Sequence, residues 1–302
     1  GCRREIAKIL ILPDTWPDAV MAVPKAAMND DNVLGLCANG RGALAQVQGI
    51  WGDIRSQYDA MLAANPHPDY PVDRRILLTR CRAWAVCRDY STELNIDCQT
   101  EFSKLANVVR WEFSVPVGMG KHIMLECTLR MAEGKNAIEL GFHRRSGAGD
   151  EAALDDRQAV RLIVRPDIED RDFHHKTKAH AGPEKYWPIA VTTFENGFDF
   201  SPGDCVLQMR APDGAFVSEP EWHYMVAHPV DAERGLDGSS DLFSPGYFTL
   251  ELCGGKSSAL HAHLPGEDAG VWQRSSEDPN HTEDRMLSLE EAARRAISDF
   301  IV

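Results

Sequence analysis

The sequence predicts an all-β sandwich that is followed by a polar linker and a single terminal helix. Turn signals rich in Gly, Pro, Asn and Asp recur about every ten residues along most of the chain. Between them lie short strand-like segments, and one alternates with a period of two, because Ile123, Leu125, Cys127 and Leu129 are all apolar. A length of 302 residues allows one large β domain or two ordinary ones and supplies ample material for a core.

The first expected elements are an N-terminal arm and a hairpin. Residues 1–32 show no clear period and are expected to form a loose arm. Residues 33–51 predict two strands joined at Asn39-Gly40-Arg41-Gly42, because Asn-Gly supplies the positive φ angles of a tight turn. Residues 55–65 predict a further extended segment, which ends where prolines recur at Pro66, Pro68 and Pro71.

A second hairpin is predicted in the middle of the chain. Residues 108–117 alternate between apolar and polar side chains, and the alternation continues over 121–131. A turn at 132–136 leads into a return strand over 137–143, and a polar connection follows over 147–157. The remaining strands are predicted at residues 74–88, 160–164, 189–194, 198–200, 206–210, 221–227, 247–252 and 257–264.

The C-terminal part of the chain has a different composition. Residues 265–284 are polar and predict a linker, whereas residues 288–302 have the apolar stripe of an amphipathic helix. Ser288 and Glu291 form a capping box at its start. The helix either leads into a further domain or packs back on the sandwich, and both interpretations stay open. The expected division is an arm (1–32), a β domain (33–264) and a linker with helix (265–302).

Charge and cysteine content restrict the class of protein. The formal net charge of −14 disfavours nucleic acid as a partner, because an acidic chain gains nothing from releasing the counterions of a phosphate backbone. A neutral partner such as a sugar is compatible with this charge. No apolar run is long enough to span a bilayer, so no membrane partner is expected. The 8 cysteines form no Cys-x-x-Cys pair and are expected to be buried free thiols, which favours the cytoplasm.

Short motifs in a fixed order give the chain a family resemblance. They are Ala38-Asn39-Gly40-Arg41-Gly42, Arg55-Ser56-Gln57-Tyr58-Asp59, Pro71-Val72-Asp73-Arg74, Thr128-Leu129-Arg130-Met131, Lys135-Asn136, Arg165-Pro166, Arg171-Asp172-Phe173-His174, Trp222-His223-Tyr224, Glu233-Arg234-Gly235-Leu236-Asp237 and Ser244-Pro245-Gly246. By their order and spacing, residues 33–264 resemble the N-terminal domain of the bacterial and archaeal type of glycogen debranching enzyme.

The resemblance implies a large antiparallel β supersandwich that precedes an α/α six-barrel. In the family, this barrel carries the hydrolytic acids of an amylo-α-1,6-glucosidase, and the helix over 288–302 corresponds to the entry into it. The expected partners are therefore the C-terminal barrel of the same protein and a branched α-glucan. The chain alone is expected to be inactive and to need no cofactor. One departure is that Arg55-Ser56-Gln57-Tyr58-Asp59 replaces the family's Arg-Tyr-His segment, so a sugar contact by that His is not carried over.

Other function classes remain as alternatives. A stand-alone carbohydrate-binding or scaffold module is the main one, and a metal-dependent enzyme of the cupin type is a distant one. The latter depends on Gly255, His261, His263 and Glu267, whose spacing matches the first cupin metal motif. Arg274 stands where that motif expects Gly, so the match is interpreted as a coincidence and no metal site is expected.

Carboxylates are the residue type that glycoside hydrolysis needs, in pairs about 5 to 10 Å apart. Asp167, Glu169, Asp170 and Asp172 form an acidic cluster that is interpreted as a solvated, salt-bridged loop. Glu233 and Asp237 are the next candidates, but an ion pair between Glu233 and Arg234 is expected to fix a turn before Gly235. By the resemblance, neither set is catalytic.

Sugar binding needs aromatic faces and planar polar groups. The candidate substrate-binding residues are Arg171, His174, Trp222, Tyr224, Arg234 and Asp237. Trp222 and Tyr224 lie either in the core of a strand or on a surface near the substrate or the barrel, and both interpretations stay open. Trp187 is a further candidate for an exposed aromatic. His174, His175 and His180 are interpreted as polar loop residues and not as metal ligands.

Overall fold

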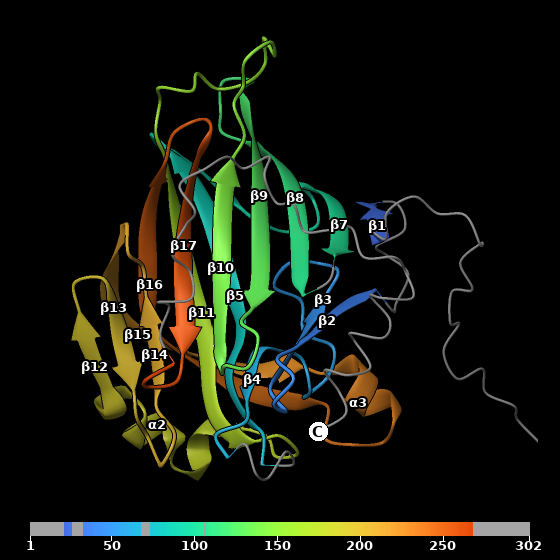
Figure 1. Ribbon diagram of the computed structural model, residues 1–302, viewed down its shortest axis with the longest axis vertical. Coiled ribbons are helices and arrows are strands. Elements are labelled where there is room, and N and C mark those ends of the chain that lie inside the picture. The colour runs from blue at the N-terminus through green and yellow to red at the C-terminus, as the bar shows by residue number, and fades with distance from the viewer. Residues whose placement is uncertain (1–20, 26–32, 68–72, 106, 268–302) are drawn as a thin grey trace, which may run out of the picture.

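A computed structural model describes residues 21–25, 33–67, 73–105 and 107–267, and it confirms the all-β sandwich (Figure 1). One sheet, sheet A, contains β1 (Met21–Pro24), β7 (Gln99–Leu105), β8 (Val108–Pro116), β9 (His122–Met131), β10 (Ala137–Arg144), β12 (Val191–Phe194), β13 (Gly197–Phe200), β14 (Leu207–Arg210) and β17 (Lys256–His263). The other, sheet B, contains β2 (Leu34–Ala38), β3 (Leu44–Gln48), β4 (Ala60–Ala64), β5 (Arg75–Cys87), β6 (Tyr90–Glu93), β11 (Val160–Asp172), β15 (Gly214–Ala227) and β16 (Ser239–Leu252). The short helices are η1 (Ala179–Ala181), α2 (Pro183–Tyr186), η2 (Pro188–Ala190) and α3 (Pro229–Glu233).

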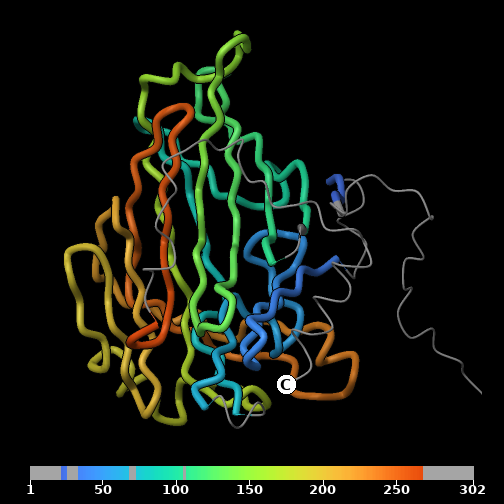
Figure 2. The backbone as a smooth tube through the Cα atoms, in the orientation of Figure 1, coloured from blue at the N-terminus to red at the C-terminus, as the bar shows by residue number. Residues whose placement is uncertain are grey.

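The strand order mixes near and distant parts of the chain. Sheet A runs β1-β7-β8-β9-β10-β17-β14-β13-β12, and sheet B runs β15-β16-β11-β5-β4-β3-β2, with β6 paired to β5. Neighbouring strands in both orders are antiparallel. In Figure 2 the orange-red β17 lies beside the green β10, although they are far apart in the sequence.

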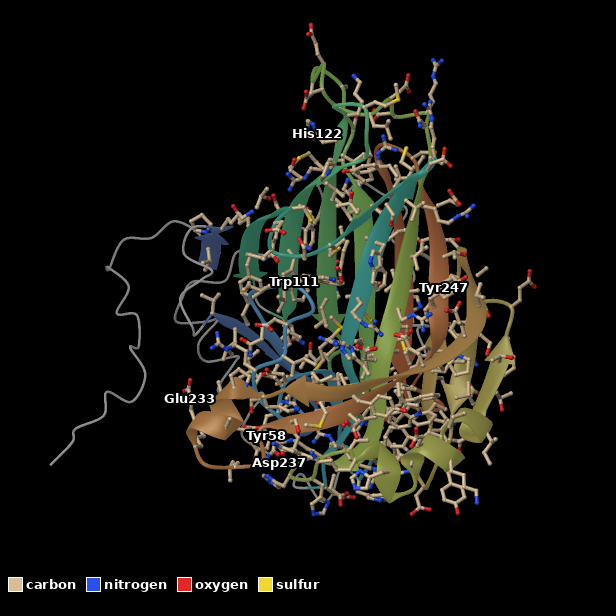
Figure 3. The ribbon with its side chains drawn as sticks, turned by 180° about the vertical axis from the view of Figure 1, so that it is seen from behind. Tyr58, Trp111, His122, Glu233, Asp237 and Tyr247 are labelled. Atoms are coloured by element: carbon tan, nitrogen blue, oxygen red, sulfur yellow. The ribbon has the colours of Figure 1, made fainter. Side chains whose placement is uncertain are left out.

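The core lies between the two sheets and contains a cluster of aromatic rings. Trp111 packs edge-on against Trp51, with 5.1 Å between the ring centroids, and Phe113 and Phe142 complete the cluster. Figure 3 shows Trp111 in the middle of the molecule. The alternation in β8 explains this placement, because Val109, Trp111 and Phe113 point inward while the residues between them are half-buried.

Both predicted hairpins are present. β2 and β3 pair from Leu34 opposite Gln48 to Ala38 opposite Leu44, and Gly40 has the positive φ (72°) that the turn requires. β9 and β10 pair with Ile138 opposite Met131. Among the described residues, 6 cysteines are buried free thiols and Cys253 is half-buried.

Several predicted boundaries are wrong. β11 does not end at Val164 but continues to Asp172, so the acidic segment interpreted as a loop is a strand. β15 and β16 likewise begin well before the predicted 221–227 and 247–252. The sequence interpretation also missed three strands, because the alternation in them is short or polar: β1 in the expected arm, β6 and β7.

Two parts of the sequence interpretation lie outside the described residues, namely the helix over 288–302 and most of the linker over 265–284. In the part of the chain that is described, none of the helices has the length and apolar character needed to cross a membrane.

Candidate functional site

Three segments that are distant in the sequence meet at one end of the sandwich, which we call the loop end. They are residues 53–59, 171–190 and 222–241, and they contain all the residues that the sequence predicts to bind substrate. Figure 3 shows Tyr58, Glu233 and Asp237 together at this end, with His122 at the opposite end.

Asp231 of helix α3 forms hydrogen bonds that connect this helix to the segment 53–59. Its carboxylate is fully buried and accepts hydrogen bonds from the Ser56 hydroxyl (3.0 Å) and the Gln57 N–H (2.9 Å). The Lys176 ammonium lies 3.2 Å from the same carboxylate. Burial acts to raise the pKa of Asp231, but these hydrogen bonds and the nearby charge outweigh it and lower the pKa below its ordinary value. The carboxylate is therefore a structural anion.

Arg171 lies beneath the surface of the loop end. It is only 6% exposed and its Nε donates to Glu169 at 2.7 Å. Its two Nη atoms donate to the carbonyl oxygens of Gln57 (2.6 Å) and His175 (2.7 Å). Thr177 donates to the same carboxylate of Glu169. Arg171 thus joins two segments of the loop end, and its donors are directed at protein acceptors.

The rest of the acidic cluster is also ion-paired within the sheet. Asp167 is fully buried between Arg80 and Arg82 of β5, each with a nitrogen 2.7 Å from a carboxylate oxygen. Asp170 pairs with Arg75 at 2.7 Å, and burial raises its pKa although this ion pair opposes the shift. The cluster is therefore salt-bridged as expected, but it lies in strand β11 and not in a solvated loop, and of its four acids Asp172 alone is exposed. Arg75, Arg80 and Arg82 of β5 pair with the aspartates, and Arg171 pairs with Glu169.

His174 lies on the surface of the loop end. Its Nδ1 is 3.2 Å from the Tyr58 hydroxyl, and its ring meets the rings of Tyr58 and Phe173 edge-on. His175 contacts Asp172 at 3.0 Å. In the described residues, no group of three or more His, Cys, Asp or Glu side chains is placed to hold a metal ion.

The residues of the cupin-like motif have different hydrogen-bond partners. His261 faces Glu139 at 3.3 Å, and His263 Nδ1 lies 3.0 Å from the Leu264 carbonyl oxygen. The Glu267 carboxylate accepts hydrogen bonds from the backbone N–H and the side-chain amide of Asn136.

A ladder of aromatic rings leads from the core to the surface of the loop end. Trp187 is buried, so the prediction that it is exposed is wrong. It stacks on Trp222 with 5.4 Å between centroids, and Trp222 stacks on Tyr224 with 6.3 Å between centroids and an angle of 19°. Tyr224 is 50% exposed, and its hydroxyl donates to a carboxylate oxygen of Glu184 at 2.6 Å. Of the two interpretations left open for Trp222 and Tyr224, the core fits half-buried Trp222 and the surface fits Tyr224.

A β-bulge turns Tyr224 and its neighbours outward. The register of β15 against β16 shifts between His223 and Val226, and His223, Tyr224 and Met225 are all exposed. Met225 has a left-handed backbone, with a φ of 56°. Its N–H donates to buried Asp241 at 2.9 Å, and the other oxygen of Asp241 accepts the N–H of Ala179. Asp241 therefore holds the bulge against η1.

Polar side chains extend this surface away from Tyr224. The Met225 sulfur lies 3.9 Å from the Ser239 hydroxyl, and Lys178 donates to the Ser239 carbonyl oxygen at 2.9 Å. Lys178 also pairs with Asp237 at 2.9 Å. We call this continuous set of residues the Tyr224 strip; it consists of Glu184, Tyr224, Met225, Ser239, Lys178 and Asp237.

Arg234 lies beside the strip in the turn that follows α3. The turn is closed by hydrogen bonds from the N–H groups of Arg234 and Gly235 to the carbonyl oxygens of Asp231 and Ala232, and Gly235 has a φ of 76°. Among the described residues no ion pair joins Glu233 to Arg234, so the prediction that such a pair fixes the turn is wrong and the backbone hydrogen bonds close it. Both of these side chains are exposed.

The structure adds residues that the sequence interpretation missed. Asp231, Asp241 and Glu184 carry the hydrogen bonds that shape the loop end, yet none lies in a recognisable motif. Glu184 is 40 residues from Tyr224, so only the folded chain brings the two together.

Comparison with known proteins gives one family match. The family described as glycogen debranching enzyme N terminal matches residues 35–259. Among solved structures, the chain is similar to a putative kojibiose phosphorylase from the human microbiome, with a TM-score of 0.34 and 8% identity. The similarity covers 88% of this chain and 34% of that chain, so the present chain spans about a third of the phosphorylase. No curated protein matches the chain.

Proposed function

The chain belongs to the glycogen debranching enzyme N-terminal family, and we propose that it is the non-catalytic β domain of a glycoside hydrolase that cleaves α-1,6 branch linkages of a branched α-glucan. The family match over residues 35–259 carries this proposal. The hydrolytic acids then lie in a C-terminal α/α-barrel of the same protein, on which this domain packs. We also propose the division into an arm (1–32), a β domain (33–264) and a linker with helix (265–302).

The chemistry of the described carboxylates supports a non-catalytic role. A glycosidase needs a general acid whose pKa is raised, so that it holds a proton near neutral pH. Asp231 and Asp237 have the opposite perturbation, because hydrogen bonds and ion pairs with lysines lower their pKa values. Burial raises the pKa values of Asp53 and Asp170, but Asp170 is ion-paired with Arg75 at 2.7 Å and Asp53 accepts the N–H of Ile54. Glu169 is tied to Arg171 and Asp167 to two arginines. These groups are suited to holding the loop end in shape.

A cytoplasmic location is part of the proposal. Six described cysteines are buried and unpaired in the core, which suits a compartment in which thiols stay reduced. The net charge of −14 suits a neutral polysaccharide better than a nucleic acid.

The test compares glucose release from a branched maltodextrin by the chain alone and by the chain joined to a catalytic barrel of its family. We expect glucose from the joined protein and none from the chain alone. Hydrolysis by the chain alone would contradict the non-catalytic role and would redirect attention to the carboxylates around Arg171 and Glu233.

A second candidate is a stand-alone carbohydrate-binding module, which the half-exposed ring of Tyr224 favours. A module of this kind leaves the hydrolysis rate of a separately added barrel unchanged, whereas a domain that packs on the barrel raises it. Binding of maltodextrin by the chain alone is compatible with both candidates.

A further inference from the structure

The ring of Tyr224 is unusually well supported for an exposed side chain. Trp222 lies behind it in a nearly parallel stack, and Trp222 itself is anchored on buried Trp187. The hydroxyl is fixed by Glu184 at 2.6 Å. A ring held at its face and at its tip loses little conformational freedom when a ligand stacks on it, so little binding free energy is lost in ordering it.

The backbone under the ring is also fixed. The left-handed conformation at Met225 costs free energy for a residue other than Gly, and it persists because Asp241 binds both Met225 and Ala179. This bulge is what places Tyr224 and Met225 next to each other on the surface, where a regular strand would point them to opposite faces. Strained backbone that is held by buried groups is typical of binding sites.

The polar members of the Tyr224 strip suit the hydroxyl groups of a sugar. The exposed Glu184 carboxylate uses one oxygen for Tyr224, and a carboxylate has further lone pairs to accept hydroxyl protons. At the other end, Lys178 and Asp237 offer a donor and an acceptor side by side. Their charges balance, so this end favours a neutral ligand over an ionic one.

We propose that the Tyr224 strip is a binding platform for a neutral, α-linked glucan chain, with one glucose ring stacked on Tyr224 and neighbouring hydroxyls bound by Glu184 and by the Lys178–Asp237 pair. The α-linked class rests on the proposed function, whereas the stacking and the neutral character come from the geometry of the strip. Sugar rings present an apolar C–H face that packs on aromatic rings, and their hydroxyls both donate and accept hydrogen bonds.

The test is isothermal titration of the complete chain with maltoheptaose, for the wild type and for Tyr224→Ala, Tyr224→Phe and Tyr90→Ala. Tyr90 is the matched control, because it is 45% exposed, near the 50% of Tyr224, and lies on β6 away from the loop end. We expect Tyr224→Ala to weaken binding by about tenfold or more and Tyr224→Phe by about threefold or less, because Phe keeps the stacking face. Tyr90→Ala should bind like the wild type.

Three outcomes would overturn the proposal: no binding of maltoheptaose, unchanged affinity in Tyr224→Ala, or equal affinity for cellohexaose, which is β-linked. If Tyr224→Ala keeps its affinity for maltoheptaose but binds an added barrel domain more weakly, the strip is a protein contact instead. Glucose release by the joined protein is measured separately. If the joined protein debranches but Tyr224→Ala keeps its affinity for maltoheptaose, this inference alone is contradicted. If the joined protein does not debranch, the proposed function is contradicted.

Discussion

Buried charges at the loop end determine how its residues respond to pH. His228 is 1% exposed, and its Nε2 lies 2.7 Å from the Ser240 hydroxyl. Lys176 and Asp231 face it across the cluster, and Glu169 of β11 adds a further charge. Burial, and then the charge of Lys176, lowers the pKa of His228 below its ordinary 6.5. Folding therefore favours the neutral form of this imidazole.

We predict that the chain loses stability as the pH falls below about 6.5, because the unfolded chain then binds a proton on His228 before the folded chain does. The contribution is fully present above that pH and is lost as the pH falls through the lower pKa of the folded state. Urea unfolding between pH 8 and pH 5 should show a smaller loss for His228→Gln than for the wild type. Parallel curves for the two proteins would contradict the assignment.

Two aspartates that both pair with lysines should differ greatly in their effect on stability. Asp231→Asn leaves the Lys176 ammonium, whose side chain is only 10% exposed, without its counter-ion. We expect a loss of about 3 to 5 kcal/mol in the free energy of unfolding. Asp237→Asn removes an exposed partner of Lys178, and solvent screening should keep its effect below about 1 kcal/mol. Equal effects by chemical denaturation would show that burial does not decide the difference.

At the candidate site, the sequence indicates the chemical type of a residue but not whether the fold leaves its polar groups accessible. Tyr224 and Asp237 lie on the Tyr224 strip and His174 is also at the surface, and their role in sugar binding stays a prediction. Arg171 is a candidate because of its planar donors, but those donors bind Glu169, Gln57 and His175. Which acceptors surround an arginine is decided by tertiary contacts, and the local sequence does not contain them.

At the scale of the element, the β15 bulge is the feature that shapes the strip. Met225 and Met119 both have positive φ angles, 56° and 53°, and Met119 lies in the exposed turn between β8 and β9. We predict that Met225→Gly raises the free energy of unfolding by about 0.5 to 1 kcal/mol, because Gly adopts this backbone without strain. The larger entropy that Gly loses on folding offsets part of the gain. Met119→Gly serves as the reference in thermal unfolding. Destabilisation at Met225 alone would mean that its side chain is needed to hold the bulge.

Strands with one apolar face were easy to predict, and β11 shows why others were not. β9 has an uninterrupted period of two that leaves one face in the core. The second half of β11 has buried side chains on both faces, and the outer ones are charged. Its aspartates are neutralised by Arg75, Arg80 and Arg82 on β5, and that pairing joins residues far apart in the chain.

At the scale of the whole molecule, one core joins both sheets. Trp111 of sheet A packs edge-on against Trp51, and its indole N–H donates to the Gln48 carbonyl oxygen of sheet B at 3.2 Å. We predict that Trp111→Ala costs about 3 to 5 kcal/mol and that Trp111→Phe costs less, because Phe fills most of the cavity. Unfolding in urea, followed by far-ultraviolet circular dichroism and by fluorescence, should stay a single transition in Trp111→Phe. Separate transitions would mean that the two sheets unfold independently.

The fold class followed from turn spacing and alternation, but the strand order did not. β17 lies between β10 and β14, and β5 lies between β11 and β4. Such neighbours are selected by the packing of whole faces, and a one-dimensional pattern does not specify it. The loop end depends on this order, because its three segments meet only after the sheets have assembled.

One measurement tests the non-catalytic role and the Tyr224 strip together, namely titration of the chain with a branched maltodextrin in a calorimeter, with released glucose measured in the same sample. The account predicts heat of binding that is lost in Tyr224→Ala and retained in Tyr90→Ala, with no glucose released by any of the three proteins. Glucose released by the chain alone would contradict the account, because a domain without the hydrolytic acids does not turn over substrate.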